Sequence, residues 1–298
     1  MTRGQRFANK VVIVTGAAQG IGQGVALGVC AEGGTVLAVD RSSLVHEVVK
    51  QIVAAGGKAS AFEADLETFA GAKAMVDEAL RSFKRVDVLI NNVGGTIWTK
   101  PYDQYGEQEI EKEIRRSLFP TLWCCRAVLP FMVKKKKGVI VNVSSIATRS
   151  IHRVPYAAAK GGVNALTASI AMEQAGNGIR INATAPGGTE APPRKVPRNT
   201  AKPTAKEKAW YQGIVDQTKE SSPMHRYGTI EEQVAPILFF ASSESAAEPA
   251  SQRFAAVSSL RFQFWYTART AFSRLFSSPT VAAQLAAPSG SRAVTVFA

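Results

Sequence analysis

The sequence predicts an α/β fold: a doubly wound parallel sheet of the Rossmann type, in a single three-layer α/β/α domain. Six short segments are apolar almost throughout and mostly rich in β-branched residues, which is typical of strands buried on both faces. Segments with helical periodicity, such as residues 20–34 and 71–83, lie between them. This repeated strand–helix–strand order predicts a parallel sheet covered by helices on both sides. The expected strands are VVIVTG (11–16), TVLAVD (35–40), ASAFEAD (59–65), VDVLINN (86–92), GVIVNVSS (138–145) and IRINATAPGG (179–188).

The first two expected strands each end in a dinucleotide-binding signal. TGAAQGIG (15–22) follows the first strand and opens a helix, and its glycines 16, 20 and 22 allow backbone N–H groups to approach a pyrophosphate. A merely tight strand-to-helix turn is the alternative. The second strand ends in Asp40, which is placed to accept hydrogen bonds from ribose hydroxyls and to repel a 2′-phosphate. These residues predict NAD as the cofactor, although the neighbouring Arg41 would tolerate that phosphate.

Composition excludes several classes of protein. The formal net charge is +13, but the basic residues are dispersed, which argues against a nucleic-acid-binding motif. No apolar run approaches the ~20 residues of a membrane-spanning helix. The three cysteines show no metal-ligand spacing and no disulfide framework, so we expect no metal and a cytoplasmic protein. A basic cluster over residues 194–208 is either an attractor for an anionic substrate or a solvated surface.

A helix-forming run behind a proline carries Tyr156 and Lys160 four residues apart, which makes them neighbours on one helix face. Free tyrosine titrates near pH ~10 and is a poor base at neutral pH, but an adjacent ammonium favours the phenolate. The phenolate is then able to take a proton from a substrate hydroxyl. An ordinary surface pair on a helix is the alternative.

Four motifs in order resemble the short-chain dehydrogenase/reductase family: TGAAQGIG, NNVG (91–94), NVSS (142–145) and YAAAK (156–160). Further stretches, NNVGGTIW, RSLFPTLWCCRAVLP and GGTEAPPRK, resemble the bacterial cis-dihydroxycyclohexadiene carboxylate dehydrogenases of that family. The similarity covers about residues 5–243. It implies a Rossmann-type dehydrogenase domain over those residues and a homo-oligomer, either tetramer or dimer.

The resemblance also implies roles for individual residues. The implied catalytic residues are Tyr156, Lys160, Ser145 and Ser117. Ser144 is the competitor of Ser145, and Ser117 stands where the wider family carries a catalytic Asn. The implied cofactor residues are Gly16, Gln19, Gly20, Ile21, Gly22, Asp40, Asp65, Leu66, Asn91, Tyr156, Lys160, Pro186, Gly187 and Thr189. For Asp65 a helix N-cap is an equal alternative.

The implied reaction is NAD-dependent oxidation of 1,6-dihydroxycyclohexa-2,4-diene-1-carboxylate, or a methyl-substituted analogue, to catechol and CO2. A bidentate arginine suits the carboxylate, and Arg194 and Arg153 are the expected substrate ligands. Two alternatives are an NADPH-dependent reductase of a ketone or 3-oxoacyl substrate and a non-catalytic cofactor-binding protein.

Residues 244–298 form an atypical tail that contains no Lys and no Asp. The family usually ends in a last apolar strand and paired glycines, which this tail does not show. We therefore expect it to be poorly ordered and to lack the final strand, and its composition resembles translation in a shifted reading frame. Loss of that strand would expose an edge of the sheet and impair assembly.

Overall fold

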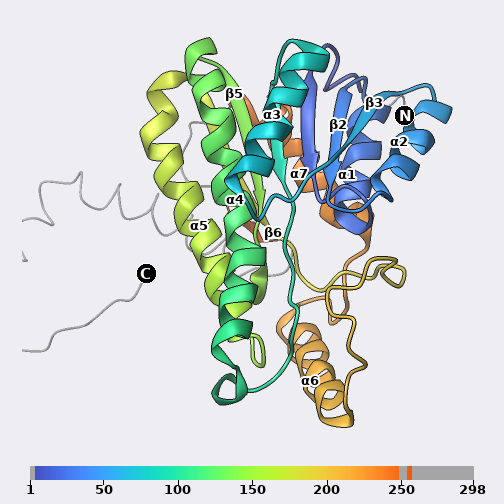
Figure 1. Ribbon diagram of the computed structural model, residues 1–298, viewed down its shortest axis with the longest axis vertical. Helices are drawn as coiled ribbons and strands as arrows, with labels where there is room; N and C mark the ends of the chain where they lie inside the picture. Colours follow the sequence, from blue (N-terminus) through green and yellow to red (C-terminus); the bar gives the residue numbers. More distant parts are fainter. Residues whose placement is uncertain (1–3, 248–253, 257–298) are drawn as a thin grey trace, which may run out of the picture. The chain divides into compact units, whose positions relative to one another are not determined.

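The protein forms a seven-stranded parallel sheet between two layers of helices, in a computed structural model that describes residues 4–247 and 254–256 (Figure 1). The strand order is β3-β2-β1-β4-β5-β6-β7, and every neighbouring pair is parallel. The predicted doubly wound α/β fold is therefore confirmed. The strands are β1 Val11–Thr15, β2 Thr35–Asp40, β3 Lys58–Glu63, β4 Val88–Asn91, β5 Gly138–Val143, β6 Ile179–Ala185 and β7 Phe254–Ala256.

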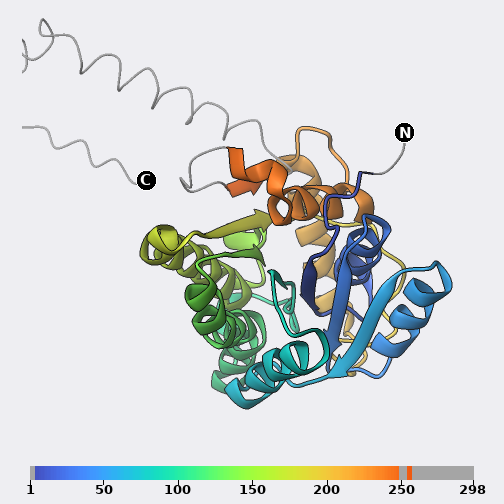
Figure 2. The same cartoon turned by 90° about the horizontal axis from the view of Figure 1, so that it is seen from above.

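The helices divide between the two faces of the sheet, as Figure 2 shows from above. Helices α1, α2 and α7 cover one face, and α3, α4 and α5 cover the other. Helix α6 belongs to the segment that connects β6 with α7. The helices are α1 Gly20–Ala31, α2 Val45–Ala54, α3 Phe69–Phe83, α4 Glu107–Lys135, α5 Val154–Gln174, α6 Ala205–Ser221 and α7 Ile230–Ala241.

Alternation along the strands produces two hydrophobic cores. Val12 and Val14 of β1 pack against α1 and α7, whereas Ile13 between them packs against the opposite layer. Successive side chains of a strand point to opposite faces, so a strand buried on both sides is apolar throughout. This is the physical reason for the continuous apolar runs in the sequence.

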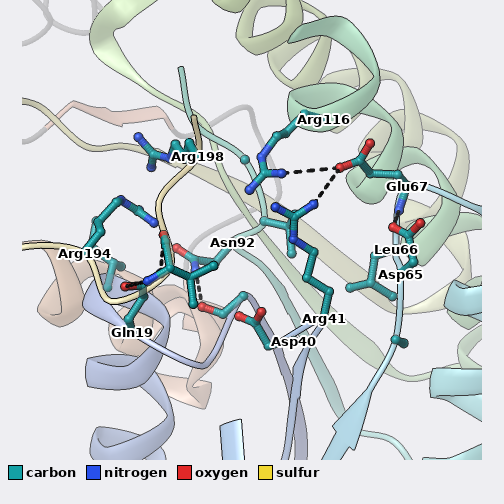
Figure 3. Close-up of a pocket in the computed structure, with 16 residues that line it drawn as sticks. Gln19, Asp40, Arg41, Asp65, Leu66, Glu67, Asn92, Arg116, Arg194 and Arg198 are labelled. Atoms are coloured by element: carbon teal, nitrogen blue, oxygen red, sulfur yellow. Dashed lines mark hydrogen bonds and ion pairs between the residues drawn. The ribbon is translucent and has the colours of Figure 1, made fainter. Parts of the chain in front are cut away.

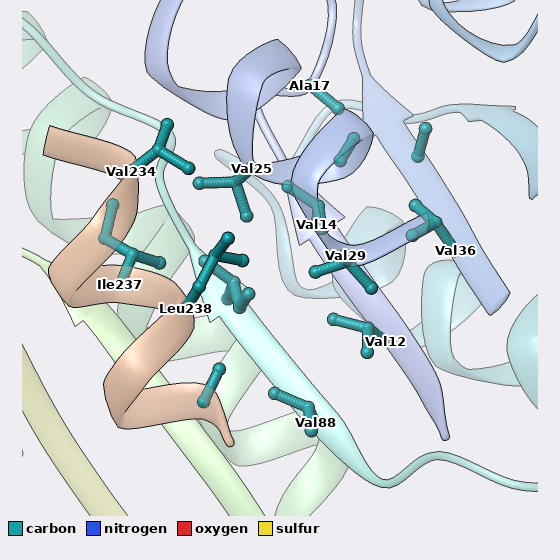
Figure 4. Close-up of a cluster of buried hydrophobic side chains, with 14 of the residues drawn as sticks. Val12, Val14, Ala17, Val25, Val29, Val36, Val88, Val234, Ile237 and Leu238 are labelled. Carbon is teal, nitrogen blue, oxygen red and sulfur yellow. The ribbon is translucent and has the colours of Figure 1, made fainter. Parts of the chain in front are cut away.

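Helix α7 seals the first core and offers a matched test of packing (Figure 4). Ile237 is fully buried there, whereas Phe239, two residues later, is 38% exposed. We expect Ile237→Ala to lower the free energy of unfolding by about 2–5 kcal/mol, the range for truncation of a buried aliphatic side chain. Phe239→Ala should cost clearly less. Urea denaturation of both variants checks this, and equal losses would contradict the assignment of α7 to the core.

The chain reverses its direction of strand addition between β1 and β4. From β1 it adds β2 and β3 on one side, then returns to place β4 on the other side of β1. In open parallel sheets, ligands bind beyond the carboxyl ends of the strands at such a reversal. The glycine turn after β1 and the Asn91–Asn92 pair, where β4 ends, both lie at this point.

The end of the sheet differs from the expectation drawn from the sequence. Residues 254–256 form β7, whose backbone pairs in parallel with Ala183–Ala185 of β6, so β6 is not the edge of the sheet. Backbone pairing needs no particular side chains, and a three-residue strand leaves too short a pattern to recognise. The other residues beyond position 247 lie outside the described part, so the domain boundary and the frameshift hypothesis stay predictions.

Within residues 4–247 and 254–256, none of the helices is long and apolar enough to cross a membrane. No group of three or more His, Cys, Asp or Glu side chains in this part of the chain is arranged to hold a metal ion.

Candidate active site

The glycine turn between β1 and α1 is shaped by close backbone packing. Gly16 and Gly20 have φ of +64° and +61°, a left-handed conformation that favours glycine. A Cβ atom on Gly22 would lie 2.1 Å from the carbonyl oxygen of Gly16. The Nδ2 atom of Asn92 closes the turn by donating hydrogen bonds of 3.2 Å to the carbonyl oxygens of Thr15 and Gly16. The first N–H groups of α1 therefore face a space suited to a phosphate group.

A cleft extends from this turn along the carboxyl ends of the strands (Figure 3). Six of the expected cofactor residues line it: Gly16, Gln19, Ile21, Asp40, Asp65 and Leu66. The Asp40 carboxylate is fixed, because it accepts hydrogen bonds of 3.1 Å from the backbone N–H groups of Ala18 and Ser42. Asp65 accepts a hydrogen bond from the N–H of Glu67 at 3.0 Å. The lining also includes several residues that the sequence did not assign to the cofactor: Ala64, Glu67, Asn92, Val93, Gly94, Arg116 and Val196.

Asn91 differs from Asn92 in where its side chain points. Asn91 is 1% exposed, and its Nδ2 donates to Asn142 Oδ1 at 2.9 Å and to Cys125 Sγ at 3.3 Å. It thus joins β4 to β5 and α4 beneath the cleft, while Asn92 lines the cleft itself. Alternation along the strand explains the difference, since consecutive side chains face opposite ways. Asn91 was expected to line the cofactor cleft, but among the described residues it is Asn92 that does so, and the role of Asn91 in cofactor binding stays a prediction.

Tyr156 and Lys160 lie together on the buried face of α5. Their side chains are 8% and 3% exposed, and Lys160 Nζ is 5.9 Å from the centre of the Tyr156 ring. Lys160 Nζ also donates a hydrogen bond of 2.7 Å to the carbonyl oxygen of Val143 at the end of β5. Burial lowers the pKa of the Lys160 ammonium, and the charge of Tyr156 acts in the opposite direction. A Cβ atom on Gly94 would lie 3.1 Å from Nζ, so the amine reaches the wall of the cleft.

The two serines after β5 have different surroundings. Ser144 is 3% exposed, and its Oγ donates to Asn164 Oδ1 and to the carbonyl oxygen of Lys160. Ser145 is half-buried, and its Oγ accepts a hydrogen bond from the N–H of Ala147 at 3.1 Å. The Ser144 hydroxyl is thus engaged inside the fold, whereas the Ser145 hydroxyl can still donate to a ligand. This favours Ser145 as the serine that contacts a substrate.

Ser117 lies on α4 and is fully buried. Its Oγ accepts a hydrogen bond from the N–H of Gly95 at 3.2 Å. One turn earlier on α4, Glu113 Oε1 accepts hydrogen bonds from the N–H groups of Ile97 and Trp98. Both side chains therefore fix the loop after β4, which forms part of the cleft wall. A role of Ser117 in proton relay stays a prediction.

The segment after β6 crosses the cleft. The Gln19 side chain holds it there, because Oε1 accepts a hydrogen bond from the N–H of Lys195 at 3.1 Å and Nε2 donates to the carbonyl oxygen of Val196 at 3.2 Å. Earlier in this segment, the carbonyl oxygen of Pro186 accepts from the N–H of Ile146, and Thr189 Oγ1 donates to the carbonyl oxygen of Gly187. Pro186 thus lies beside the residues that follow β5, Thr189 pairs with Gly228, and none of Pro186, Gly187 and Thr189 lines the cleft.

The basic side chains near Tyr156 are not equivalent. Arg153 Cζ lies 5.8 Å from the centre of the Tyr156 ring, and its Nε donates to Ser150 Oγ at 2.7 Å. Arg194 is exposed and lines the cleft near Asp40. Arg198 packs on Gly95, where a Cβ atom would lie 2.0 Å from its Cζ. Its Nε is buried and has no hydrogen-bond partner within the described part of the chain.

Comparison with known proteins agrees with this site. A family model described as short chain dehydrogenase matches residues 10–202. A protein of Acinetobacter baylyi named 1,6-dihydroxycyclohexa-2,4-diene-1-carboxylate dehydrogenase is 59% identical over 246 residues, which are 83% of this chain and 94% of that protein. A Pseudomonas putida protein of the same name is 58% identical over 242 residues, covering 81% and 89%.

The fold comparison gives the same family. The crystal structure of a 3-oxoacyl-(acyl-carrier protein) reductase from Brucella melitensis with bound NAD matches with a TM-score of 0.72 and 25% identity, over 86% of this chain and 93% of that one. The order of the motifs, the strand topology and these matches lead to one conclusion. The chain belongs to the short-chain dehydrogenase family.

Proposed function

We propose that the protein oxidises 1,6-dihydroxycyclohexa-2,4-diene-1-carboxylate, or a methyl-substituted analogue, with NAD and yields a catechol and CO2. The observation that carries the catalytic part is the buried Tyr156–Lys160 pair beside the cleft that begins at the glycine turn. The substrate is the one in the name of the two relatives that are 58–59% identical to this chain over the aligned residues.

The residues of the cleft fit NAD. The turn at Gly22 leaves space that a single Cβ atom would fill, and the fixed Asp40 carboxylate is placed for ribose hydroxyls. Gly16, Gly20 and the N-terminus of α1 would hold the pyrophosphate, and Asp65 and Leu66 the adenine. When bound, NAD supplies the acceptor for the hydride.

The protein's own residues handle the proton. The Tyr156 oxygen, with the Lys160 ammonium beside it, takes the proton from the secondary alcohol of the substrate as the hydride leaves. Ser145 donates a hydrogen bond to the substrate oxygen as it becomes a carbonyl. The product is a β-keto acid, which loses CO2 as its ring becomes aromatic. The protein binds the ring until the ketone has formed, and the loss of CO2 follows.

Three arginines near the site are candidates for binding the substrate carboxylate. Arg153 already donates to Ser150, and Arg194 lies toward Asp40. Arg198 has a buried Nε without a hydrogen-bond partner among the described residues. Burial lowers the pKa of the Arg198 guanidinium, and the charge of Tyr156 acts in the opposite direction. A buried guanidinium group needs hydrogen-bond acceptors, and a carboxylate supplies two in the matching geometry. We therefore place Arg198 first among the three.

Removal of this guanidinium should affect only substrates that carry a carboxylate. We expect Arg198→Met to raise KM for the diol carboxylate about 10- to 100-fold, as for the loss of about 1.5–3 kcal/mol of charge-assisted hydrogen bonding. The KM of the carboxylate-free cyclohexadiene cis-diol should stay unchanged. Lys202→Met, on an exposed residue of the same basic segment, is the control. An equal rise of KM for both diols in the Arg198 variant would contradict this role.

Incubation with the benzoate cis-diol and NAD tests the function itself. We expect NADH, CO2 and catechol in equal amounts, and slower turnover with NADP. Reduction of a ketone or 3-oxoacyl substrate with NADPH, without diol oxidation, would instead support the alternative enzyme class. A homo-oligomer and a cytoplasmic location belong to the same proposal, and light scattering measures the first.

A further inference from the structure

One carboxylate in the cofactor cleft is shared by two arginines. Glu67 Oε1 lies 3.7 Å from Arg41 Nη1 and 3.6 Å from Arg116 Nη1, and Figure 3 shows both guanidinium groups turned toward it. The three residues come from different elements: Arg41 follows β2, Glu67 follows β3, and Arg116 belongs to α4. All three line the cleft together with Asp40.

The two arginines have more donors than Glu67 satisfies. Both N–O distances exceed the length of a normal hydrogen bond, so Glu67 holds the guanidinium groups by charge. The Nε of Arg116 is buried and has no hydrogen-bond partner in residues 4–247 and 254–256. Burial lowers the pKa of Arg116, and the like charge of Arg41 adds to this effect. A second anion between these arginines would therefore be bound favourably.

NADP differs from NAD by one phosphate on the adenosine 2′-oxygen, and an arginine near the end of the second strand is able to accommodate it. Asp40 holds this position with a carboxylate that two backbone N–H groups fix in place. Arg41 is the next residue, and its side chain is 46% exposed, which leaves it free to turn toward a 2′-phosphate. In the structure it turns toward Glu67 instead.

We propose that Glu67 is a specificity-determining residue that disfavours NADP by holding Arg41 and Arg116 away from the 2′-phosphate position. This inference rests on the proposed function, because it requires a dinucleotide in the cleft. Glu67 acts in two ways: it neutralises part of the arginines' charge, and its own charge repels a phosphate. Asp40 and Glu67 then disfavour NADP separately: Asp40 acts at the ribose itself, and Glu67 acts on the arginines and the phosphate position beside it.

Direct binding measurements test this without turnover. Isothermal titration of NAD+ and NADP+ should show that Glu67→Gln strengthens NADP+ binding by about tenfold, which corresponds to ~1.4 kcal/mol, while NAD+ binding changes less than about twofold. The gain should shrink at high salt, because Arg41 is exposed and Glu67 is partly exposed, so that salt screens their charges. The matched control is Glu63→Gln, at the exposed end of β3, where the carboxylate pairs with His46 and does not line the cleft.

A second variant separates the arginines from a general loss of structure. Adding Arg41→Gln to Glu67→Gln should remove the gain in NADP+ affinity, with thermal melting showing that both variants fold. Unchanged NADP+ binding in Glu67→Gln, or an equal change for both cofactors, would overturn the proposed role of Glu67 and leave the cofactor site standing. Failure of the unaltered protein to bind either dinucleotide would overturn the cofactor site of the proposed function, and this inference with it.

Discussion

Replacing Tyr156 by Phe is expected to lower the rate of NADH formation by about 10²–10⁴-fold, the usual contribution of a positioned acid–base group. Only the hydroxyl is removed, and the ring keeps its place between Arg153 and Lys160. Affinity for NAD+ should therefore stay within a factor of about two and the melting temperature within a few degrees. Steady-state kinetics and calorimetric titration measure both.

Tyr102→Phe is the matched control, because Tyr102 is 56% exposed and lies on a short 3-10 helix outside the cleft. It should retain full activity. Lys160→Ala should lower the rate as well, because it removes the charged group that lies beside the Tyr156 ring. Turnover by the Tyr156 variant at more than a tenth of the original rate would exclude the phenol as the group that takes the proton.

The second large effect is expected at the glycine turn. In Gly22→Ala, the added Cβ atom would lie 2.1 Å from the carbonyl oxygen of Gly16 and 2.6 Å from Asn92 Nδ2. The nearest neighbour is backbone, so the turn itself has to move and the N–H groups that face the pyrophosphate move with it. We expect NAD+ affinity to fall at least about 10²-fold, since several charge-assisted hydrogen bonds of about 1.5–3 kcal/mol each are disturbed.

Gly161→Ala controls for the change of glycine to alanine. Gly161 lies inside α5, and a Cβ atom there would have no neighbour within 4 Å. This variant should bind NAD+ normally and gain about 0.5–1 kcal/mol of stability, because alanine favours helix. Titration and urea denaturation of the two variants give the comparison. Normal NAD+ affinity in Gly22→Ala would contradict the placement of the pyrophosphate at this turn.

Much of the fold was predictable from local patterns. The continuous apolar runs indicate a sheet buried on both faces, and the glycines of the first turn indicate the conformation of that turn. Both features depend only on residues that are close in the sequence. The Tyr156–Lys160 pair was also predictable, because one helical turn brings the two side chains together. The expected role of Asp40 at the ribose was predictable from its place at the end of β2.

Other parts of the site depend on contacts between distant segments. The sequence does not show which of Asn91 and Asn92 faces the cleft, because this depends on the residue at which β4 ends. The link of Glu67 to Arg116 joins residues 49 positions apart in the sequence on different elements, and no local pattern indicates it. Arg198 packs on Gly95, 103 positions away in the sequence, and Gln19 binds the backbone of Lys195 and Val196 in the same segment as Arg198. Strand β7 pairs through its backbone, and its three residues are too few to show a strand pattern in the sequence.

A single-turnover reaction with the benzoate cis-diol deuterated at its secondary alcohol carbon tests the central claim most directly. The account predicts that the deuterium appears in the reduced nicotinamide, that catechol and CO2 form in equal amounts, and that Tyr156→Phe forms all three at least about 10²-fold more slowly while it still binds NAD+. Catechol formed without labelled reduced cofactor, or the same label transfer by the Tyr156 variant, would contradict it.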